Sequence, residues 1–260
     1  MSRITPFLLT LVSLLAPAAR VCGQVPDAPY NTAILGIERS MTPGGMYSAS
    51  EAANTALREA VTIRDGRIRV DAAKARPSYC SEATYLVFLK LLEAMPEADK
   101  APLDERLAKA LRPGNQPDGV GIWGRWNANG PGTAVLFHEQ KLGTNFTDPR
   151  MARPGDFLKI FWNENIGASE HGHSVIYLGR TNTAGVDSIS FWSSNQPNGY
   201  GERTVPVSRI KRFLFSRLLH PERLHLPDPW KNDYLSSLVS RSSTPGEMNR
   251  EAGISTTPRP

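Results

Sequence analysis

Cysteine is scarce in this chain of 260 residues, which has two, Cys22 and Cys80. Cys22 lies in an N-terminal stretch that reads as an export signal, so Cys80 would be the only thiol of the mature protein. An exported protein can form disulfides, but a lone thiol has no partner within its own chain. The sequence therefore excludes a disulfide-stabilised scaffold and leaves Cys80 free for chemistry.

Long apolar runs and clustered positive charge are missing too. The apolar run at residues 7–15 is too short for a comfortable membrane span, and no other run is long enough. The formal net charge of +5 falls to +3 when Arg3 and Arg20 leave with the signal. We find no arginine-rich stripe with interleaved aromatic residues, so nucleic acid is not an expected partner. A mildly basic surface suits an anionic cell envelope.

Residues 1–23 are expected to be a secretory signal peptide. A basic start, a short apolar centre and the small residues Val21 and Gly23 fit the pattern that precedes a cleavage site. Two alternatives remain open, an uncleaved N-terminal anchor and a lipid on Cys22, against which the charged Arg20 counts. With cleavage, we expect an exported protein, periplasmic or extracellular, that has no stable membrane span.

The remaining chain predicts helices followed by a sheet. Ser48 and Glu51 are spaced as a capping box for a helix that ends near residue 62. A helix that is apolar nearly all round, and therefore buried, starts near Cys80. The other expected elements are a short strand at 67–70, helices at 103–111 and 133–141, and strands at 157–162, 174–178, 186–192 and 203–207. Short polar connections between these strands indicate an antiparallel sheet, and helices followed by a sheet indicate an α+β fold.

This pattern divides the chain into four parts. After the signal, residues 24–75 form an N-terminal extension with a helix, and the proline and glycine before residue 45 predict an extended start. Residues 76–226 form the main domain. Residues 227–260 lose apolar periodicity and become rich in serine, threonine and proline, so we expect a disordered tail.

Cys80 is the candidate nucleophile. A thiol at a helix N-terminus ionises more easily, because the helix dipole and the free backbone N–H groups favour the anion. The thiolate can attack an amide or ester carbonyl and form a thioester. The alternative is a buried, inert cysteine that packs as a small hydrophobe.

His173 is the candidate base. It lies at the start of an expected strand, and its imidazole can take the thiol proton and later return a proton to a leaving amine. His171 competes for this role, because residues two apart on a strand share a face. A second alternative is that His171, His173 and Cys80 bind a metal. No acidic residue or second cysteine motif supports such a site, so we expect no metal and no cofactor.

Asn195 is the candidate third member of the site. Its side chain can accept a hydrogen bond from the far ring N–H of the histidine, as in Cys-His-Asn enzymes. The alternative is a turn residue, because residues 193–199 are dense in turn formers. Gln196 and Asn198 are weaker candidates for the same role.

A long glycine-rich stretch at residues 115–132 contains Trp123 and Trp126. Long loops with aromatic residues often face a substrate, but the tryptophans could equally fasten the loop to the core. Our candidates for substrate contact are Tyr79, Trp123, Trp126, His171 and Gln196.

These motifs together resemble the NlpC/P60 and CHAP superfamily of papain-like cell-wall amidases and endopeptidases. The resemblance covers residues 77–217. Its carriers are Tyr79-Cys80-Ser81 at the start of an apolar helix, Arg153-Pro154-Gly155-Asp156-Phe157 at the start of a strand, Gly172-His173-Ser174-Val175-Ile176-Tyr177-Leu178-Gly179, and Ser194-Asn195-Gln196.

The resemblance implies a half-barrel antiparallel sheet packed on the cysteine helix, with a catalytic domain at residues 76–226. It implies hydrolysis of amide bonds in peptidoglycan stem peptides, or of the bond that joins peptide to glycan. Cys80 would be the nucleophile, His173 the base and Asn195 the polar third member. Tyr79 and Lys159 depart from the common family pattern, which bears on substrate choice.

Two other functions stay open. The chain could be a thiol peptidase or acyltransferase on a substrate other than peptidoglycan, or a non-catalytic envelope-binding protein. Because an uncontrolled wall hydrolase would harm its host, we also expect control by localisation, by the loop at 115–132 or by an unknown regulator.

Overall fold

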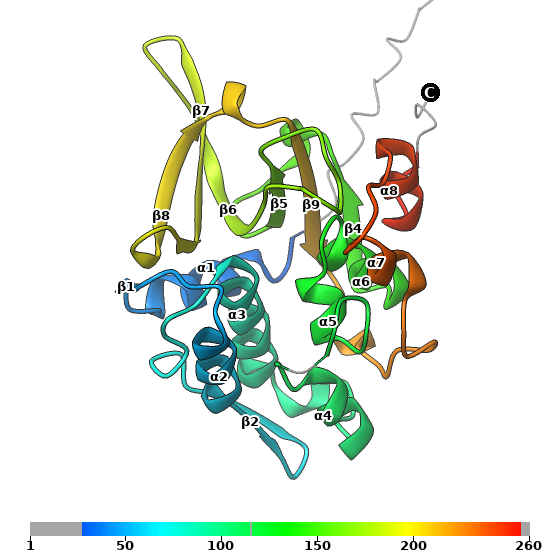
Figure 1. Cartoon of the computed structure of the whole chain (residues 1–260). Helices are drawn as coiled ribbons and strands as arrows, with labels where there is room; N and C mark the ends of the chain where they lie inside the picture. Colours follow the sequence, from blue (N-terminus) through cyan, green and yellow to red (C-terminus); the bar gives the residue numbers. More distant parts are fainter. Residues whose placement is uncertain (1–27, 115, 256–260) are drawn as a thin grey trace, which may run out of the picture.

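The computed structural model describes residues 28–114 and 116–255, and the expected signal at 1–23 lies outside them. The fold is α+β, as predicted, with a seven-stranded antiparallel sheet and helices. In Figure 1 the sheet occupies the upper half of the molecule, and helices α2, α3 and α4 lie below its open end. Within the described ranges, no helix combines the length and the apolar character needed to cross a bilayer.

The sheet has the strand order β1-β8-β7-β6-β5-β9-β4, and each neighbouring pair is antiparallel. The bounds of its strands are β1 Gly44–Gly45, β4 Gly143–Phe146, β5 Phe157–Phe161, β6 Gly172–Thr183, β7 Val186–Asn195, β8 Gly199–Pro206 and β9 Arg212–Leu218. A separate hairpin joins β2 (Val61–Arg64) to β3 (Arg67–Val70). The four predicted sheet strands correspond to β5, β6, β7 and β8, whereas the sequence did not predict the edge strands β1 and β4 or β9, which lies between β5 and β4.

Helix α3 (Cys80–Ala94) is the buried helix that the sequence predicts. Phe88 and Leu89 on this helix are fully buried, and they belong to the same core as Ile34 and Leu57. Ile34 lies on helix α1 (Asn31–Ser40) and Leu57 on helix α2 (Glu51–Ala60). The described part of the extension, residues 28–75, therefore packs into the core around α3.

The extended start predicted for residues 24–45 is wrong from Asn31 to Ser40, which form α1. Buried Asn31, Ile34 and Glu38 recur at helical spacing, so one face of the segment meets the core. The prolines and most glycines of this stretch flank the helix. Because the prediction rested on the average composition of the whole stretch, it did not detect the helical spacing of the buried residues. The capping box predicted at Ser48 and Glu51 is also wrong, because α2 begins one residue after Ser50 and has no side-chain cap.

The other predicted helices are present as α4 (Glu105–Leu111) and α6 (Gly132–Glu139). Between them the glycine-rich stretch contains a short helix, α5 (Trp123–Asn127).

The disordered tail predicted for residues 227–260 is wrong for its described part. Helices α7 (Asp233–Ser237) and α8 (Pro245–Glu251) pack against the body of the protein. Their buried apolar residues are Leu235, Leu238, Met248 and Ala252, which join clusters that include residues of α6, β5 and β9. Apolar residues this widely spaced leave no periodic signal in a serine-rich segment.

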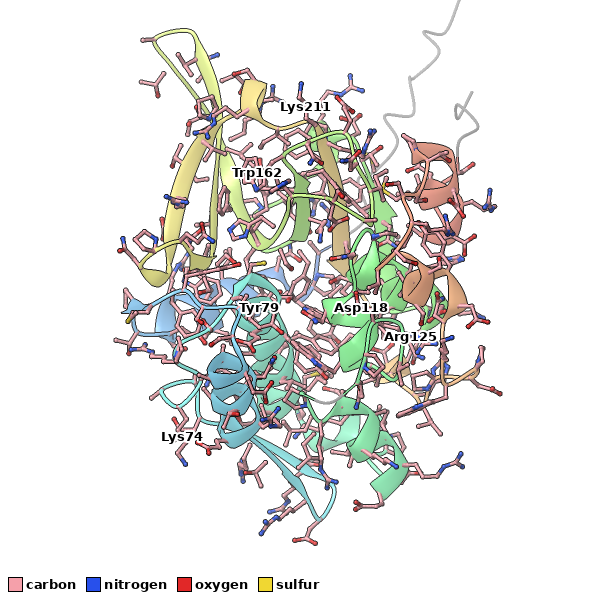
Figure 2. All side chains as sticks on the ribbon, viewed as in Figure 1. Lys74, Tyr79, Asp118, Arg125, Trp162 and Lys211 are labelled. Carbon is pink, nitrogen blue, oxygen red and sulfur yellow. The ribbon has the colours of Figure 1, made fainter. Side chains whose placement is uncertain are left out.

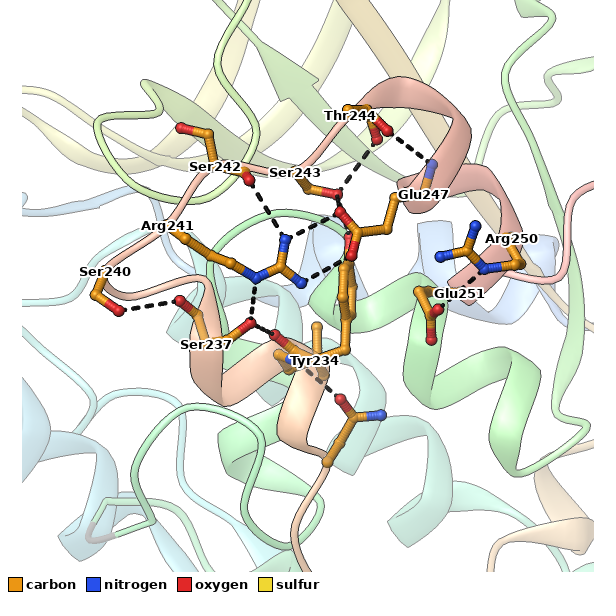
Figure 3. Close-up of polar contacts among 12 residues, drawn as sticks. Tyr234, Ser237, Ser240, Arg241, Ser242, Ser243, Thr244, Glu247, Arg250 and Glu251 are labelled. Carbon is orange, nitrogen blue, oxygen red and sulfur yellow. Dashed lines mark hydrogen bonds and ion pairs between the residues drawn. The ribbon is translucent and has the colours of Figure 1, made fainter.

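A polar network holds the two C-terminal helices together (Figure 3). The Arg241 guanidinium donates to both carboxylate oxygens of Glu247, at 2.9 and 2.8 Å. These contacts and the Ser243 hydroxyl lower the pKa of Glu247 to about 2. Residues 256–260 of the predicted tail lie outside the described residues.

Candidate active site

Cys80 is the first residue of α3, and its thiol is free and partly exposed. The preceding residue, Tyr79, has extended backbone angles and donates its N–H to Glu82 Oε2 at 3.2 Å. The first N–H groups of a helix have no partner within the helix and carry its positive dipole end. Cys80 therefore lies where an anion is favoured, as the sequence predicts.

His173 on β6 and Asn195 at the end of β7 are in direct contact. His173 Nε2 lies 3.0 Å from Asn195 Oδ1. The Asn195 amide nitrogen donates to the backbone carbonyls of Ser193 at 3.1 Å and Gly201 at 2.7 Å. Because these two carbonyls require the nitrogen, the amide oxygen must face the histidine, and a proton on Nε2 completes that bond. Nδ1 is then left unprotonated and able to accept the thiol proton.

The surroundings of Cys80 favour its thiolate. Burial on its own raises the pKa of the thiol, but a hydrogen bond from His173 and the positive charge of that ring oppose this effect. The Ser174 backbone and the Lys159 charge act in the same direction, and together they lower the pKa of Cys80 from 9.0 to about 7. A substantial fraction of the thiol is therefore ionised near neutral pH.

Serine and threonine hydroxyls hold the helix, β6 and β7 in register around the site. Thr84 Oγ1, one turn after Cys80, lies 2.9 Å from Ser174 Oγ on β6. On β7, Ser193 Oγ donates to the Ser174 carbonyl at 2.7 Å, and Ser194 Oγ donates to the Ser78 carbonyl at 2.8 Å. Each of the three candidate residues therefore lies within four positions of a cross-element hydrogen bond.

Two hollows open on either side of the Cys80–His173 pair. The first, which we call the Cys80 cavity, has a volume of about 280 Å³, and its walls include Cys80, Asn127, Gly130 and Lys159. The second, which we call the His173 cleft, has a volume of about 610 Å³. Residues from several segments line the cleft, among them Tyr47, Trp162, Glu170, His171, His173, Phe191, Gln196, Arg203 and Arg209. In Figure 2, Trp162 projects from the sheet above Tyr79 and Asp118, which lie at the top of the helical half.

A buried ion pair lies in the wall between the hollows. Lys159 Nζ lies 2.7 Å from Glu170 Oε1, and the Glu170 side chain is 4% exposed. Burial lowers the pKa of Lys159, but the charge and hydrogen bond of Glu170 more than compensate and raise it overall, so the ammonium stays charged. A Cβ atom on Gly172 would lie 2.6 Å from Lys159 Nζ and 2.8 Å from Glu170 Oε1, so a larger residue before His173 would displace this ion pair.

Glu170 also fastens the glycine-rich stretch to the sheet. Its Oε2 accepts the backbone N–H groups of Gly130 at 2.6 Å and Gly167 at 2.7 Å. Buried Arg125 donates from Nη1 to the carbonyls of Gly119 and Gly121 at 3.0 and 2.9 Å, and from Nε to Glu139 at 2.6 Å. One side of the Cys80 cavity is therefore built by polar contacts within this stretch.

The two tryptophans of this stretch lie in the core. Trp123 is 1% exposed and lines neither hollow. It therefore fastens the loop to the core, which was one of the two predicted roles. Trp126 is 2% exposed, stacks on Phe88 and donates from Nε1 to Thr84 Oγ1 at 3.2 Å. Trp126 contributes only to the floor of the Cys80 cavity.

The other predicted contact residues line the hollows. Tyr79 lines the Cys80 cavity and directs its hydroxyl to Asn54 Oδ1 at 3.1 Å. His171 and Gln196 are exposed on the His173 cleft. Of the two histidines, His173 is the one that contacts both Cys80 and Asn195. Within the described ranges, His, Cys, Asp and Glu side chains form no group of three arranged to hold a metal ion.

Tyr47 and Asn127 are further candidate site residues, which the sequence did not predict. Tyr47 comes from the N-terminal extension and lines the His173 cleft. Burial, and to a smaller extent the charges of Cys80 and Glu82, raise the pKa of Tyr47 to about 12. Asn127 accepts a hydrogen bond from Ser81 Oγ at 2.5 Å on its oxygen, which leaves its nitrogen as a donor in the Cys80 cavity. Either could join the Cys80 backbone N–H in binding an oxyanion. No local motif marks them, because each reaches the site from a distant segment.

Comparisons with protein-family models, with curated proteins and with solved structures found no match to this chain.

Proposed function

We propose that this chain is an exported cysteine amidase or endopeptidase of the papain-like type, which hydrolyses amide bonds of peptidoglycan stem peptides through a thioester. One observation carries the proposal. The His173 ring bridges Cys80 and Asn195, with Nε2 3.0 Å from Asn195 Oδ1, and its contact on the other side is the largest of the effects that lower the pKa of Cys80 to about 7. A nucleophile, a base and an orienting amide in this order are the parts that thiol hydrolysis needs.

In the first step, His173 Nδ1 takes the Cys80 proton, and Sγ attacks the carbonyl carbon of the scissile amide. The carbonyl oxygen becomes an oxyanion, which the Cys80 N–H and a second donor, Tyr47 or Asn127, stabilise. The C–N bond then breaks as the imidazolium returns the proton to the leaving nitrogen. The products of this step are a free amine and an acyl thioester on Cys80.

In the second step, water attacks the thioester while His173 Nδ1 takes one of its protons. The C–S bond breaks, the thiol regains a proton, and the acyl half leaves as a carboxylic acid. Asn195 keeps the ring in one orientation through both steps, because its own nitrogen is held by Ser193 and Gly201. The balanced reaction is amide plus water to acid plus amine.

The choice of peptidoglycan rests on the sequence resemblance and on the expected export. Hollows on both sides of the reacting pair suit an extended peptide whose scissile bond lies over Cys80. The thioester itself would serve a peptidase or an acyltransferase equally well, so the products must identify the substrate.

The test is digestion of purified peptidoglycan by the wild-type chain and by Cys80→Ala, with the soluble products identified by mass spectrometry. We expect new fragments with free amine and carboxyl ends from the wild type and none from the variant, whose thermal unfolding should match the wild type. Fragments released equally by both proteins, or by neither while both are folded, would refute the proposal. Transfer of the acyl group to an added amine would identify an acyltransferase.

A further inference from the structure

We propose that the His173 cleft binds a carboxylate on the amine half of the substrate through Arg203 and Arg209. The inference rests on the proposed amidase function and names the chemical class of its leaving group. Both arginines are exposed and line the cleft together with His173.

The two guanidinium groups have no protein counter-charge. Within residues 28–114 and 116–255 neither forms an ion pair or a side-chain hydrogen bond. Glu170 is the carboxylate in the wall of the cleft. Lys159 occupies its Oε1, and the backbone N–H groups of Gly130 and Gly167 occupy its Oε2. The cleft therefore has an excess of positive charge that a bound anion would balance.

The sheet register places Arg203 on the face of the sheet from which Phe191 projects. Arg203 on β8 is the cross-strand partner of Phe191 on β7, and such partners project from the same face of a sheet. The Phe191 ring packs edge-on against His173, with ring centroids 5.6 Å apart. The neighbouring Glu202 is the partner of Trp192 and projects from the opposite face. Arg203 thus shares a face with the base, and the nearest acid on its strand does not.

The direction of the reaction determines which half of the substrate meets these arginines. The acid that protonates a leaving nitrogen must lie within hydrogen-bonding reach of it. The leaving amine therefore lies on the His173 side, in the cleft, and the acyl half lies toward the Cys80 cavity. Guanidinium groups pair with carboxylates through two parallel hydrogen bonds. The fitting leaving group is an amino acid whose carboxylate is close to the scissile nitrogen.

The main test compares two peptides with the same acyl half, alanyl-γ-glutamyl-lysine with a free terminal carboxylate and its carboxamide. We expect the wild type to prefer the carboxylate by roughly tenfold or more in kcat/KM, because charge-assisted hydrogen bonds are lost in the amide. The double variant Arg203→Gln/Arg209→Gln should lose most of this preference. The matched control is Arg64→Gln/Arg67→Gln, which removes the same charge from the distant β2–β3 hairpin and should retain it.

A second test does not depend on hydrolysis. Mass spectrometry of the Cys80 peptide measures the rate at which anionic iodoacetate alkylates Cys80 and the rate with neutral iodoacetamide. The quantity of interest is the ratio of the first rate to the second. This ratio should fall severalfold in the Arg203/Arg209 variant and stay unchanged in the hairpin control, because the positive cleft attracts the anion.

The two tests separate the failure of this inference from the failure of the proposed function. The carboxylate site is overturned if the wild type cleaves both peptides without a charge preference. It is also overturned if the preference survives in the Arg203/Arg209 variant. Either outcome leaves the amidase proposal intact. If peptidoglycan and both peptides resist the wild type, the amidase proposal fails. An unchanged alkylation ratio in the Arg203/Arg209 variant then overturns the anion site as well, and a lowered ratio supports it.

Discussion

Thr84 Oγ1 on α3 lies 2.9 Å from Ser174 Oγ on β6, and this contact joins the helix that begins at Cys80 to the strand that contains His173. Thr84 follows Cys80 by one helical turn, and Ser174 follows His173 directly. The threonine hydroxyl also accepts a hydrogen bond from Trp126 Nε1 at 3.2 Å. A fully buried hydroxyl therefore links the segments that contain Cys80 and His173.

Replacement of Thr84 by valine keeps its shape and removes this hydroxyl. We expect the free energy of unfolding to fall by about 1–3 kcal/mol, because the Trp126 N–H and the Ser174 hydroxyl lose a buried partner. Chemical denaturation measures the loss. The matched control is Thr204→Val, which breaks the exposed Ser190–Thr204 hydroxyl pair and should cost less than about 0.5 kcal/mol. Equal costs in the two variants would contradict the linking role of Thr84.

Replacement of Asn195 by alanine should lower kcat by about 10- to 100-fold with little change in KM, because the His173 ring loses the group that fixes its orientation. Nitrogen NMR of the labelled ring should show a mixture of tautomers in place of protonated Nε2. Asn198→Ala, which changes an exposed turn residue, is the control and should react as the wild type does. A wild-type rate in Asn195→Ala would remove Asn195 from the site.

The alkylation of Cys80 should depend on pH with a midpoint near pH 7, because the pKa of the thiol is lowered to about 7. Below the midpoint the thiol is protonated and slow, and above it the thiolate reacts. In His173→Ala the midpoint should rise by more than about one pH unit, since burial then acts without the opposing hydrogen bond and charge. His225→Gln, an exposed histidine, is the control. A midpoint that is the same with and without His173 would refute the pairing.

Glu82 should make the protein less stable as the pH rises. Burial raises the pKa of Glu82 to about 8; the Tyr79 N–H opposes the shift and the negative charge of Cys80 adds to it. Between about pH 5 and pH 8 the carboxyl is ionised in the unfolded chain but protonated in the folded one, so ionisation favours unfolding by up to a few kcal/mol. Glu82→Gln should flatten this decline in urea denaturation at several pH values. The exposed Glu59→Gln should follow the wild type, and a wild-type slope in Glu82→Gln would contradict the assignment.

The local features of the site could be read from the sequence. A segment that is apolar nearly all round predicted the helix that starts at Cys80, and the run at residues 174–178 predicted the strand that follows His173. Signals of this kind are local, because the periodicity of a helix or strand depends on neighbouring residues. The sequence did not predict the C-terminal helices. A few widely spaced apolar side chains, such as Leu235 and Met248, pack these helices against the core, and such spacing leaves no periodic pattern.

The sequence by itself determined the helix of Cys80, the strand of His173, the α+β class and the order of the candidate residues. The tertiary structure alone decided which side chains meet. It brought Tyr47 from the extension, Lys159 from β5 and Asn127 from the glycine-rich stretch toward Cys80, and it placed Arg203 in the lining of the cleft that His173 also lines. Contacts between residues this far apart depend on strand register and on the packing of a shared core. Neither is encoded in any short segment of the chain.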